Sequence, residues 1–524
     1  MTDNATAPAS SGNAQIDDIA KGYAFDGAAL EFGAAVVDNT AYPAAKVRIP
    51  LAVLNRHGLV AGATGTGKTK TLQLMAEQLC AAGVPTFLAD IKGDISGIAT
   101  AGTPNDKITA RATSIGETWA PTAYPTEFYS LGGLGNGIPI RATITSFGPT
   151  LLSKVLGLND TQESCLGLVF HYADSKGLSL LDLKDLRAVI QFLTSDEGKA
   201  DLVGLGGLSS ATAGVLLREL IGFSDQGADV FFGEPEFDTS DLLRTASDGR
   251  GMVSCLELPA VQDKPALFST FLMWLLADLF HDLPEVGDLD KPKLVFFFDE
   301  AHLLFEGASK DFLTSIEQTV RLIRSKGVGI FFVTQSPKDV PSNVLAQLSN
   351  RVQHALRAFT PDDAKALRAA VSTYPKSGYD LTSLLTSLGI GEAVITVLSE
   401  TGAPTPVAWT RMRAPQSLMA PSSDDAIKGV INASPLQARY GTSIDRQSAY
   451  ELLNARLAAA PAPTPLAPPP ASAAPPRQAA AKQDPGMVQQ VLKSSAFKSM
   501  LRSAGTVVGR EITRSIFGTA SRSR

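Results

Sequence analysis

Short apolar runs alternate with longer stretches of helical spacing along most of this chain. The apolar runs end in glycine or in polar residues and predict buried strands at 59–61, 84–89, 251–258, 293–298, 329–335, 351–357 and 391–397. The last of these is expected to close the sheet. Between them, apolar residues recur at the period of an amphipathic helix. Buried strands that alternate with helices predict an α/β fold, with a mostly parallel sheet that carries helices on both faces.

The spacing also divides the chain into parts. Residues 1–18 are rich in Ala, Ser, Thr and Asn and are expected to be disordered. Residues 19–420 hold the predicted sheet. Within them, residues from about 103 to 145 contain many Gly, Pro and Thr and predict loops with short strands. The stretch at about 147–225 has helical spacing. We interpret this stretch as a helical insertion in the core, although a separate small domain would show the same spacing. Residues 421–454 are expected to form a C-terminal helical extension.

The last part of the chain changes composition twice. Residues 455–486 are rich in Ala and Pro, which predicts a disordered, semi-rigid linker. Residues 487–524 carry basic side chains against Glu511 alone, and their apolar residues keep helical spacing, which predicts a basic amphipathic helix. Such a tail can bind DNA, an anionic membrane or a protein partner, or it can pack on its own assembly, and the sequence leaves these alternatives open.

Charge, cysteine content and hydropathy limit the partners and the cellular compartment expected for this protein. The formal net charge is −6, so any contact with nucleic acid must come from a local basic patch or a lined channel. Cys80, Cys165 and Cys255 lie far apart, which suits a reducing compartment. The N-terminus lacks a signal-peptide pattern, and the longest apolar run, 266–280, is too short to span a bilayer. We expect a cytoplasmic protein with no integral membrane segment.

A phosphate-binding pattern, G-x-x-x-x-G-K-[ST], matches the stretch Gly62-Ala63-Thr64-Gly65-Thr66-Gly67-Lys68-Thr69. The stretch stands between a predicted strand and a predicted helix, the context that this pattern requires. Its glycines let backbone N–H groups turn toward phosphate oxygens, and the helix adds the positive end of its dipole. Lys68 is expected to reach the β- and γ-phosphates, and the Thr69 hydroxyl to bind Mg²⁺. The expected ligands are therefore ATP and Mg²⁺.

Two acidic residues, Asp299 and Glu300, directly follow three phenylalanines of a predicted strand. The carboxyl ends of strands in an open α/β sheet are where ligands bind. Asp299 is expected to hold Mg²⁺ together with Thr69, and Glu300 to orient and deprotonate an attacking water. Gln335 ends the next core strand, where it either senses the γ-phosphate or simply caps the strand. These roles make hydrolysis of the γ-phosphate the predicted reaction.

Further polar residues extend the candidate site. Asp90 and Asp94 follow another buried strand and serve either as carboxylates near the water around the metal or as caps of their own loop. Fast hydrolysis often needs an arginine directed at the γ-phosphate, which a neighbouring subunit can supply. We expect Arg324 in this role, with Arg351 as the second choice, and surface salt bridges as the alternative for both.

These residues together resemble the HerA/FtsK group of P-loop ATPases, and within it the YjgR-type branch of bacterial HerA-like proteins is the most similar. The resemblance covers roughly residues 20–420 and the basic tail. It rests on six stretches, namely Asn55–Thr69, Gly287–Leu294, Asp299–His302, Val320–Gly327, Phe332–Gln335 and Asn350–Pro361.

The resemblance implies a RecA-like core that assembles into a hexameric ring, with Arg324 acting on the neighbouring subunit. Family members of known role pump duplex DNA through such a ring with ATP. This chain departs from HerA itself in two ways, because it has no room for an N-terminal β-barrel and because it carries the helical insertion. A DNA motor is thus the expected function, and the alternative is an oligomeric ATPase or switch that acts on protein or membrane partners through the tail.

Overall fold

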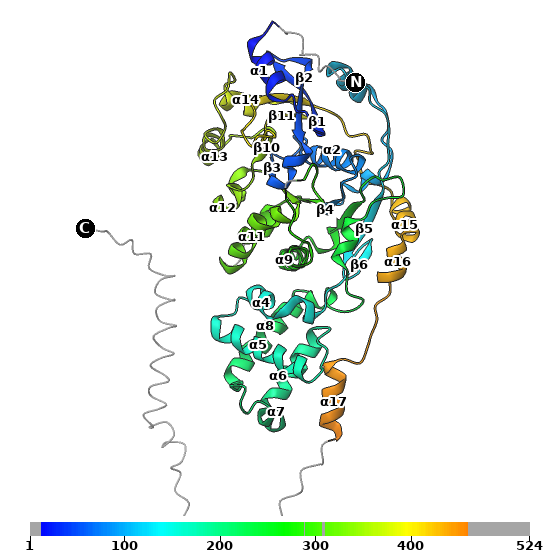
Figure 1. Cartoon of the computed structure of the whole chain (residues 1–524), viewed down its shortest axis with the longest axis vertical. Helices are drawn as coiled ribbons and strands as arrows, with labels where there is room; N and C mark the ends of the chain where they lie inside the picture. The colour runs from blue at the N-terminus through cyan, green and yellow to red at the C-terminus, as the bar shows by residue number, and fades with distance from the viewer. Residues whose placement is uncertain (1–11, 288, 306–309, 460–524) are drawn as a thin grey trace, which may run out of the picture. The chain divides into compact units, whose positions relative to one another are not determined.

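The computed structural model of the protein describes residues 12–287, 289–305 and 310–459 (Figure 1). One twelve-stranded sheet organises them. Its strands are β1 Ala29–Val37, β2 Thr40–Pro50, β3 Gly58–Ala61, β4 Thr86–Asp90, β5 Thr126–Leu131, β6 Ile138–Ile140, β7 Val253–Glu257, β8 Leu294–Phe298, β9 Val328–Thr334, β10 Asn350–Gln353, β11 Glu392–Thr396 and β12 Ala408–Met412.

The order of the strands in the sheet is β2-β1-β12-β11-β10-β3-β9-β8-β4-β7-β5-β6. Neighbours from β10 to β6 run parallel, and neighbours from β2 to β10 run antiparallel. The predicted α/β fold with a mostly parallel sheet is confirmed. Because β3, β9, β8 and β4 are adjacent and parallel, the residues that follow each of them meet at one edge of the sheet.

Helices fill the connections between strands. They are α1 Ala14–Gly22, α2 Lys68–Ala81, α3 Asp106–Ser114, α4 Ile144–Val155, α5 Asp160–Ser175, α6 Leu183–Thr194, α7 Asp196–Asp201, α8 Ser210–Asp225, α9 Pro265–Asp282, α10 His302–Phe305, α11 Lys310–Ile323, α12 Ser342–Leu345, α13 Pro361–Val371, α14 Leu381–Ser387, α15 Asp424–Ala433, α16 Pro435–Tyr440 and α17 Ala449–Ala459. No helix in the described ranges combines the length and apolarity needed to cross a membrane.

The centre of the sheet is apolar on every strand that leads to the candidate site. All residues of β3, β4, β8 and β9 are buried. Phe87 of β4 packs its ring against Phe296 of β8 and against Phe271 of α9. Burial of this kind excludes water from the strands and fixes the positions of the polar residues at their ends.

Helices α4–α8 gather into one group next to α9 (Figure 1). Asp185, buried in α6, accepts hydrogen bonds from the backbone N–H groups of Leu181 and Tyr450. This carboxylate fastens the start of α17 to the helical group, so two segments far apart in the sequence pack together.

Four details of the predicted organisation are corrected. Residues 14–18 belong to α1 and are not disordered, because the Asn13 side chain caps this helix while Ile16 and Ile19 are buried. Helix α3, capped by Asn105, lies in a stretch expected to hold only loops and short strands. Strand β11 does not close the sheet, because β12, β1 and β2 continue it. Helix α17 runs into the start of the predicted 455–486 linker; the rest of that linker and the 487–524 tail lie outside the described residues.

Candidate nucleotide site

The phosphate loop leaves β3 and enters α2, as the pattern predicted. Gly62 has φ +158°, and a Cβ built on it would lie 2.5 Å from the Cβ of His354, so only glycine fits. Gly67 caps α2 in the left-handed region with φ +116°. The backbone N–H of Ala63 donates to the carbonyl of Ala355 at 2.8 Å. The sheet next to β3 therefore holds the loop in a fixed shape.

Lys68, the first residue of α2, is 8% exposed. Its ammonium donates to the Ala63 carbonyl at 3.2 Å and so lies across the loop. Burial lowers the pKa of Lys68, while the nearby carboxylates of Glu300 and Asp299 act in the opposite direction. A poorly solvated ammonium in a curl of backbone N–H groups is suited to bind phosphate oxygens.

Asp299 follows β8 and is 2% exposed. Its Oδ1 accepts from the backbone N–H of Glu300 at 2.9 Å, whereas its Oδ2 is buried without a hydrogen-bond partner among the described residues. Burial, followed by the charge of Glu300, raises the pKa of Asp299 to about 7. An orphan carboxylate oxygen at this edge fits a hard cation such as Mg²⁺. Thr69, in the first turn of α2, adds a hydroxyl at the same edge.

Glu300 is 5% exposed and has φ +48°, a left-handed conformation that is uncommon for a residue other than glycine. Its Oε1 accepts from the Lys92 ammonium, and its Oε2 lies 3.4 Å from Nδ1 of His302. Burial acts to raise the pKa of Glu300, but the hydrogen bond and charge of Lys92 outweigh it and lower the pKa. The carboxylate next to the candidate metal ligand is therefore held ionised.

A cavity of about 840 Å³ opens on one side of the loop. It includes Ala63 and Thr64 of the loop together with His302, Gln335 and Arg357. Gln335 directly follows β9 and is exposed to this space. The cavity thus gives a phosphate group access to the residues that follow β8, β9 and β10.

Arg324 and Arg351 lie at the other edge of the sheet. Arg324 begins the short helix η6 Arg324–Lys326, which leads into the amino end of β9, and its side chain is exposed. Arg351 is paired with Leu59 near the amino end of β3, and its guanidinium donates to Thr373 at 2.5 Å. Because the loop follows the carboxyl end of β3, neither arginine is positioned to act on the site of its own chain.

Asp90 acts as a cap of its own loop. Its Oδ1 accepts from the backbone N–H groups of Gly93 and Asp94, and its Oδ2 accepts from Ile95. Burial raises the pKa of Asp90 to about 6. Asp94 keeps a buried oxygen without a hydrogen-bond partner among the described residues.

Two residues of this site were not chosen for a role in the sequence-based prediction. Lys92 contacts Glu300, and its position just after β4 was the available signal. Arg357 lines the large cavity although it stood in the sequence only as one of several arginines. His57 has a structural role here, because it donates through Nε2 to the Val320 carbonyl and accepts through Nδ1 from the Ile330 N–H.

Comparison with known proteins agrees with this geometry. A protein-family model described as "Helicase HerA-like C-terminal" matches residues 37–524. The DNA double-strand break repair helicase HerA of Saccharolobus solfataricus is 25% identical over 208 residues, which are 39% of this chain and 39% of that protein. The protein of the same name from Sulfolobus acidocaldarius is 35% identical over 101 residues, 18% of this chain and 19% of that protein. Each match therefore spans well under half of the relative.

Among solved structures, the plasmid coupling protein TrwB in complex with the non-hydrolysable GTP analogue GDPNP is similar in fold. It is 17% identical to this chain, and the similarity covers 76% of this chain and 98% of that one with a TM-score of 0.50. The expected RecA-like P-loop fold is confirmed at this level, whereas the narrower placement in the YjgR-type branch stays a prediction.

Proposed function

Because the chain belongs to the helicase HerA-like C-terminal family, we propose that it is a Mg²⁺-dependent ATP hydrolase of the HerA/FtsK type that forms a ring and acts as a motor on duplex DNA. One observation supports hydrolysis of ATP. The same edge of the sheet holds Lys68, the Asp299 Oδ2 that lacks a hydrogen-bond partner, and the ionised Glu300. Charge compensation and positioning are what transfer of a phosphoryl group to water requires.

Each group has a separate task in this proposal. The loop N–H groups and Lys68 hold the phosphates, and Thr69 and Asp299 hold Mg²⁺, which when bound offsets the charge of the β- and γ-phosphates. Glu300 orients the attacking water and accepts its proton. Gln335 and Arg357, which both line the cavity of about 840 Å³, contact the γ-phosphate from the side away from α2.

The ring is proposed because of the position of Arg324. This exposed arginine lies at the sheet edge opposite its own loop, so it serves hydrolysis only if a neighbouring copy brings its loop to it. An arginine supplied in this way makes hydrolysis depend on assembly. Arg351 is less suited, because its guanidinium is already bonded to Thr373.

Action on duplex DNA is proposed from the family and from the named function of the HerA relatives. The test is ATP turnover by the full-length protein with and without linear duplex DNA, at low and moderate salt. A DNA motor shows stimulation that falls steeply with salt, because phosphate contacts release counterions. ATP turnover that does not change with DNA would support the ATP hydrolase and contradict the DNA motor. The next experiment would then search for partners of the 487–524 tail. Absence of turnover in every condition would contradict the hydrolase itself.

A further inference from the structure

A second cavity lies on the other side of the phosphate loop. Its volume is about 240 Å³. One part of its lining is Gly67, the last glycine of the loop, together with Lys70 and Thr71 of the first turn of α2. The larger cavity starts instead at Ala63 and Thr64, close to the residues that follow β8 and β9. In the proposed function the γ-phosphate of a bound triphosphate lies at the larger cavity, beside Gln335 and Arg357. The α-phosphate and the attached nucleoside would then point to the smaller cavity.

The walls of the smaller cavity are apolar enough for a flat ring. Ile108, Ile390, Met412, Pro415 and Met419 contribute to them. Ile390 is 76% exposed and Met419 is 37% exposed, so both present apolar surface that nothing in the described chain covers. The volume is below the roughly 300 Å³ at which pockets for whole drug-sized ligands begin. It therefore suits one ring system and not an entire nucleotide.

Arg111 of α3 holds one wall in place. Its guanidinium donates to the carbonyls of Ile390 at 2.8 Å, Gly391 at 2.9 Å and Met412 at 3.3 Å. The guanidinium group is planar. A Cβ built on Gly391 would lie 3.3–3.4 Å from Cζ and both Nη atoms, which places Gly391 over one face of the plane. The opposite face is thus the surface of Arg111 that is left to stack on a ligand.

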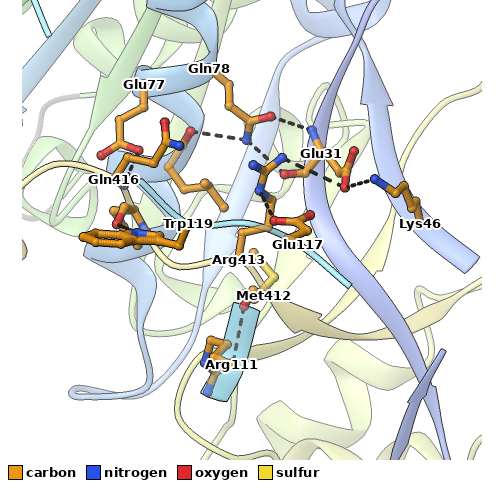
Figure 2. Close-up of polar contacts among 12 residues, drawn as sticks. Glu31, Lys46, Glu77, Gln78, Arg111, Glu117, Trp119, Met412, Arg413 and Gln416 are labelled. Atoms are coloured by element: carbon orange, nitrogen blue, oxygen red, sulfur yellow. Dashed lines mark hydrogen bonds and ion pairs between the residues drawn. The ribbon is translucent and has the colours of Figure 1, made fainter. Parts of the chain in front are cut away.

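The wall behind the cavity is fixed by half-buried polar contacts (Figure 2). Arg413 donates to Glu117 at 2.7 Å, and Trp119 Nε1 donates to the Pro415 carbonyl at 2.8 Å. Glu77 of α2 accepts from the backbone N–H of Gln416 at 2.8 Å. The cavity is therefore formed before any ligand arrives, and α2 itself supports its wall.

From these observations we infer that the smaller cavity holds the purine base of the bound nucleotide, stacked on Arg111 and covered by Ile390. This inference rests on the proposed function, because it needs a triphosphate in the loop. The polar side chains on the walls are largely bonded to the protein: Lys70 donates to Gln73 and the Asp94 carbonyl, and Arg111 to the three carbonyls. Lys107 and Asn105 also line the cavity and are exposed. Their N–H groups can donate to N7, an acceptor that adenine and guanine share, so adenine and guanine nucleotides are expected to bind with similar affinity.

The experiment compares two probes on the full-length protein by calorimetry, a non-hydrolysable ATP analogue and inorganic tripolyphosphate, both with Mg²⁺. Ile390→Ser removes exposed apolar surface without disturbing the core, and Val203→Ser, at a residue that is 83% exposed in the helical group, is the matched control. We expect Ile390→Ser to weaken the nucleotide about five- to tenfold. Its affinity for tripolyphosphate is expected to match that of the wild type, as is the affinity of Val203→Ser for both probes.

Base selectivity is measured with the corresponding GTP and CTP analogues. We expect the ATP and GTP analogues to agree within about tenfold and the CTP analogue, with its single ring, to bind more weakly. Equal binding of nucleotide by Ile390→Ser and wild type would overturn the base site, as would equal weakening of nucleotide and tripolyphosphate. If the wild type bound neither probe, the proposed function would fail together with this inference.

Discussion

Lys92 and Glu300 form an ion pair across the carboxyl ends of two adjacent strands. Strands β4 and β8 run parallel with Ala89 beside Phe298, so the residues just beyond their ends meet. The lysine keeps the proposed base ionised and also occupies one of its oxygens. The other oxygen, Oε2, has no hydrogen-bond partner among the described residues, so in the proposed reaction it is the oxygen left to accept from the attacking water.

The pH dependence of turnover tests this pair. Lys92 lowers the pKa of Glu300, so removing the lysine raises it, and a base must be deprotonated to act. In Lys92→Ala, the acid limb of the kcat profile is expected to move to higher pH, and Lys92→Arg is expected to restore it in part. Lys46→Ala breaks an exposed pair with Glu31 and is the control. An unchanged acid limb in Lys92→Ala would show that Lys92 does not set the pKa of the general base.

Removing the base itself separates binding from chemistry. Glu300→Gln keeps the shape of the side chain but cannot accept a proton, so we expect turnover to fall by about 10²–10⁴ while ATP binding persists. Lys68→Ala is expected to lose binding as well, since its ammonium lies across the phosphate loop. Nucleotide affinity and turnover measured on the same preparations distinguish the two. Loss of binding in Glu300→Gln would assign that residue a structural role.

Mixing two inactive variants tests the arginine from a neighbouring subunit. Arg324→Ala is expected to lower kcat about a thousandfold or more. Mixed with Glu300→Gln subunits, it regains activity, because some interfaces combine an intact Glu300 with an intact Arg324. Arg351→Ala, treated in the same way, is the control at the same sheet edge. Mixtures no more active than the separate variants would contradict a shared site.

A buried carboxyl at the end of β7 predicts how stability depends on pH. Burial, followed by the charge of Asp90, raises the pKa of Glu257 to about 8. Between its unfolded pKa and pH 8 the folded protein binds more protons at this group than the unfolded chain does. The group alone therefore removes about 1.4 kcal/mol of unfolding free energy for each pH unit of increase in that range.

Glu257→Gln abolishes this titration, so the variant is expected to gain stability relative to the wild type as the pH rises from 5 to 8. Urea unfolding at several pH values measures the difference. The control is Glu451→Gln, a surface carboxylate that accepts from Ser448. If the unfolding free energies of Glu257→Gln and the wild type changed with pH in parallel, Glu257 would have the same pKa in the folded and unfolded states, which would contradict the prediction.

The sequence allowed the parts of this site that depend on one strand and its next residues to be predicted. Three phenylalanines followed by Asp299 and Glu300 are typical of a buried strand that ends at a polar cleft. The glycine pattern at 62–69 is likewise enough to predict its own loop. Lys92 pairs with Glu300 because β4 lies next to β8 in the sheet. The order of strands in a sheet cannot be deduced from the sequence pattern of each strand. The small cavity is built from α2, α3, the residues just before β11 and the residues from the end of β12 onward. It was not predicted, because the sequence does not show that these segments lie together.

Composition gave wrong predictions in segments that lack a regular hydrophobic pattern. The stretch that holds α3 is rich in Gly, Pro and Thr, yet Asn105 caps a helix there and Ile108 anchors it. Strand β12 is only Ala408–Met412, too short for alternation to reveal, and its place beside β1 comes from tertiary pairing. Local signals thus specify the edge of the sheet that holds the candidate site, and long-range pairing specifies the antiparallel side of the sheet.

The pairing of β1 with β12 imposes an order of events during synthesis. The ribosome makes β1 and β2 first, and β12, the other neighbour of β1, emerges only after several hundred further residues. At about 5–20 residues per second, the nascent hairpin waits tens of seconds or more with an apolar edge open to other chains. Fragments that end before Met412 keep that edge open permanently, so truncated products of this chain should aggregate and depend on chaperones more than the full-length protein does.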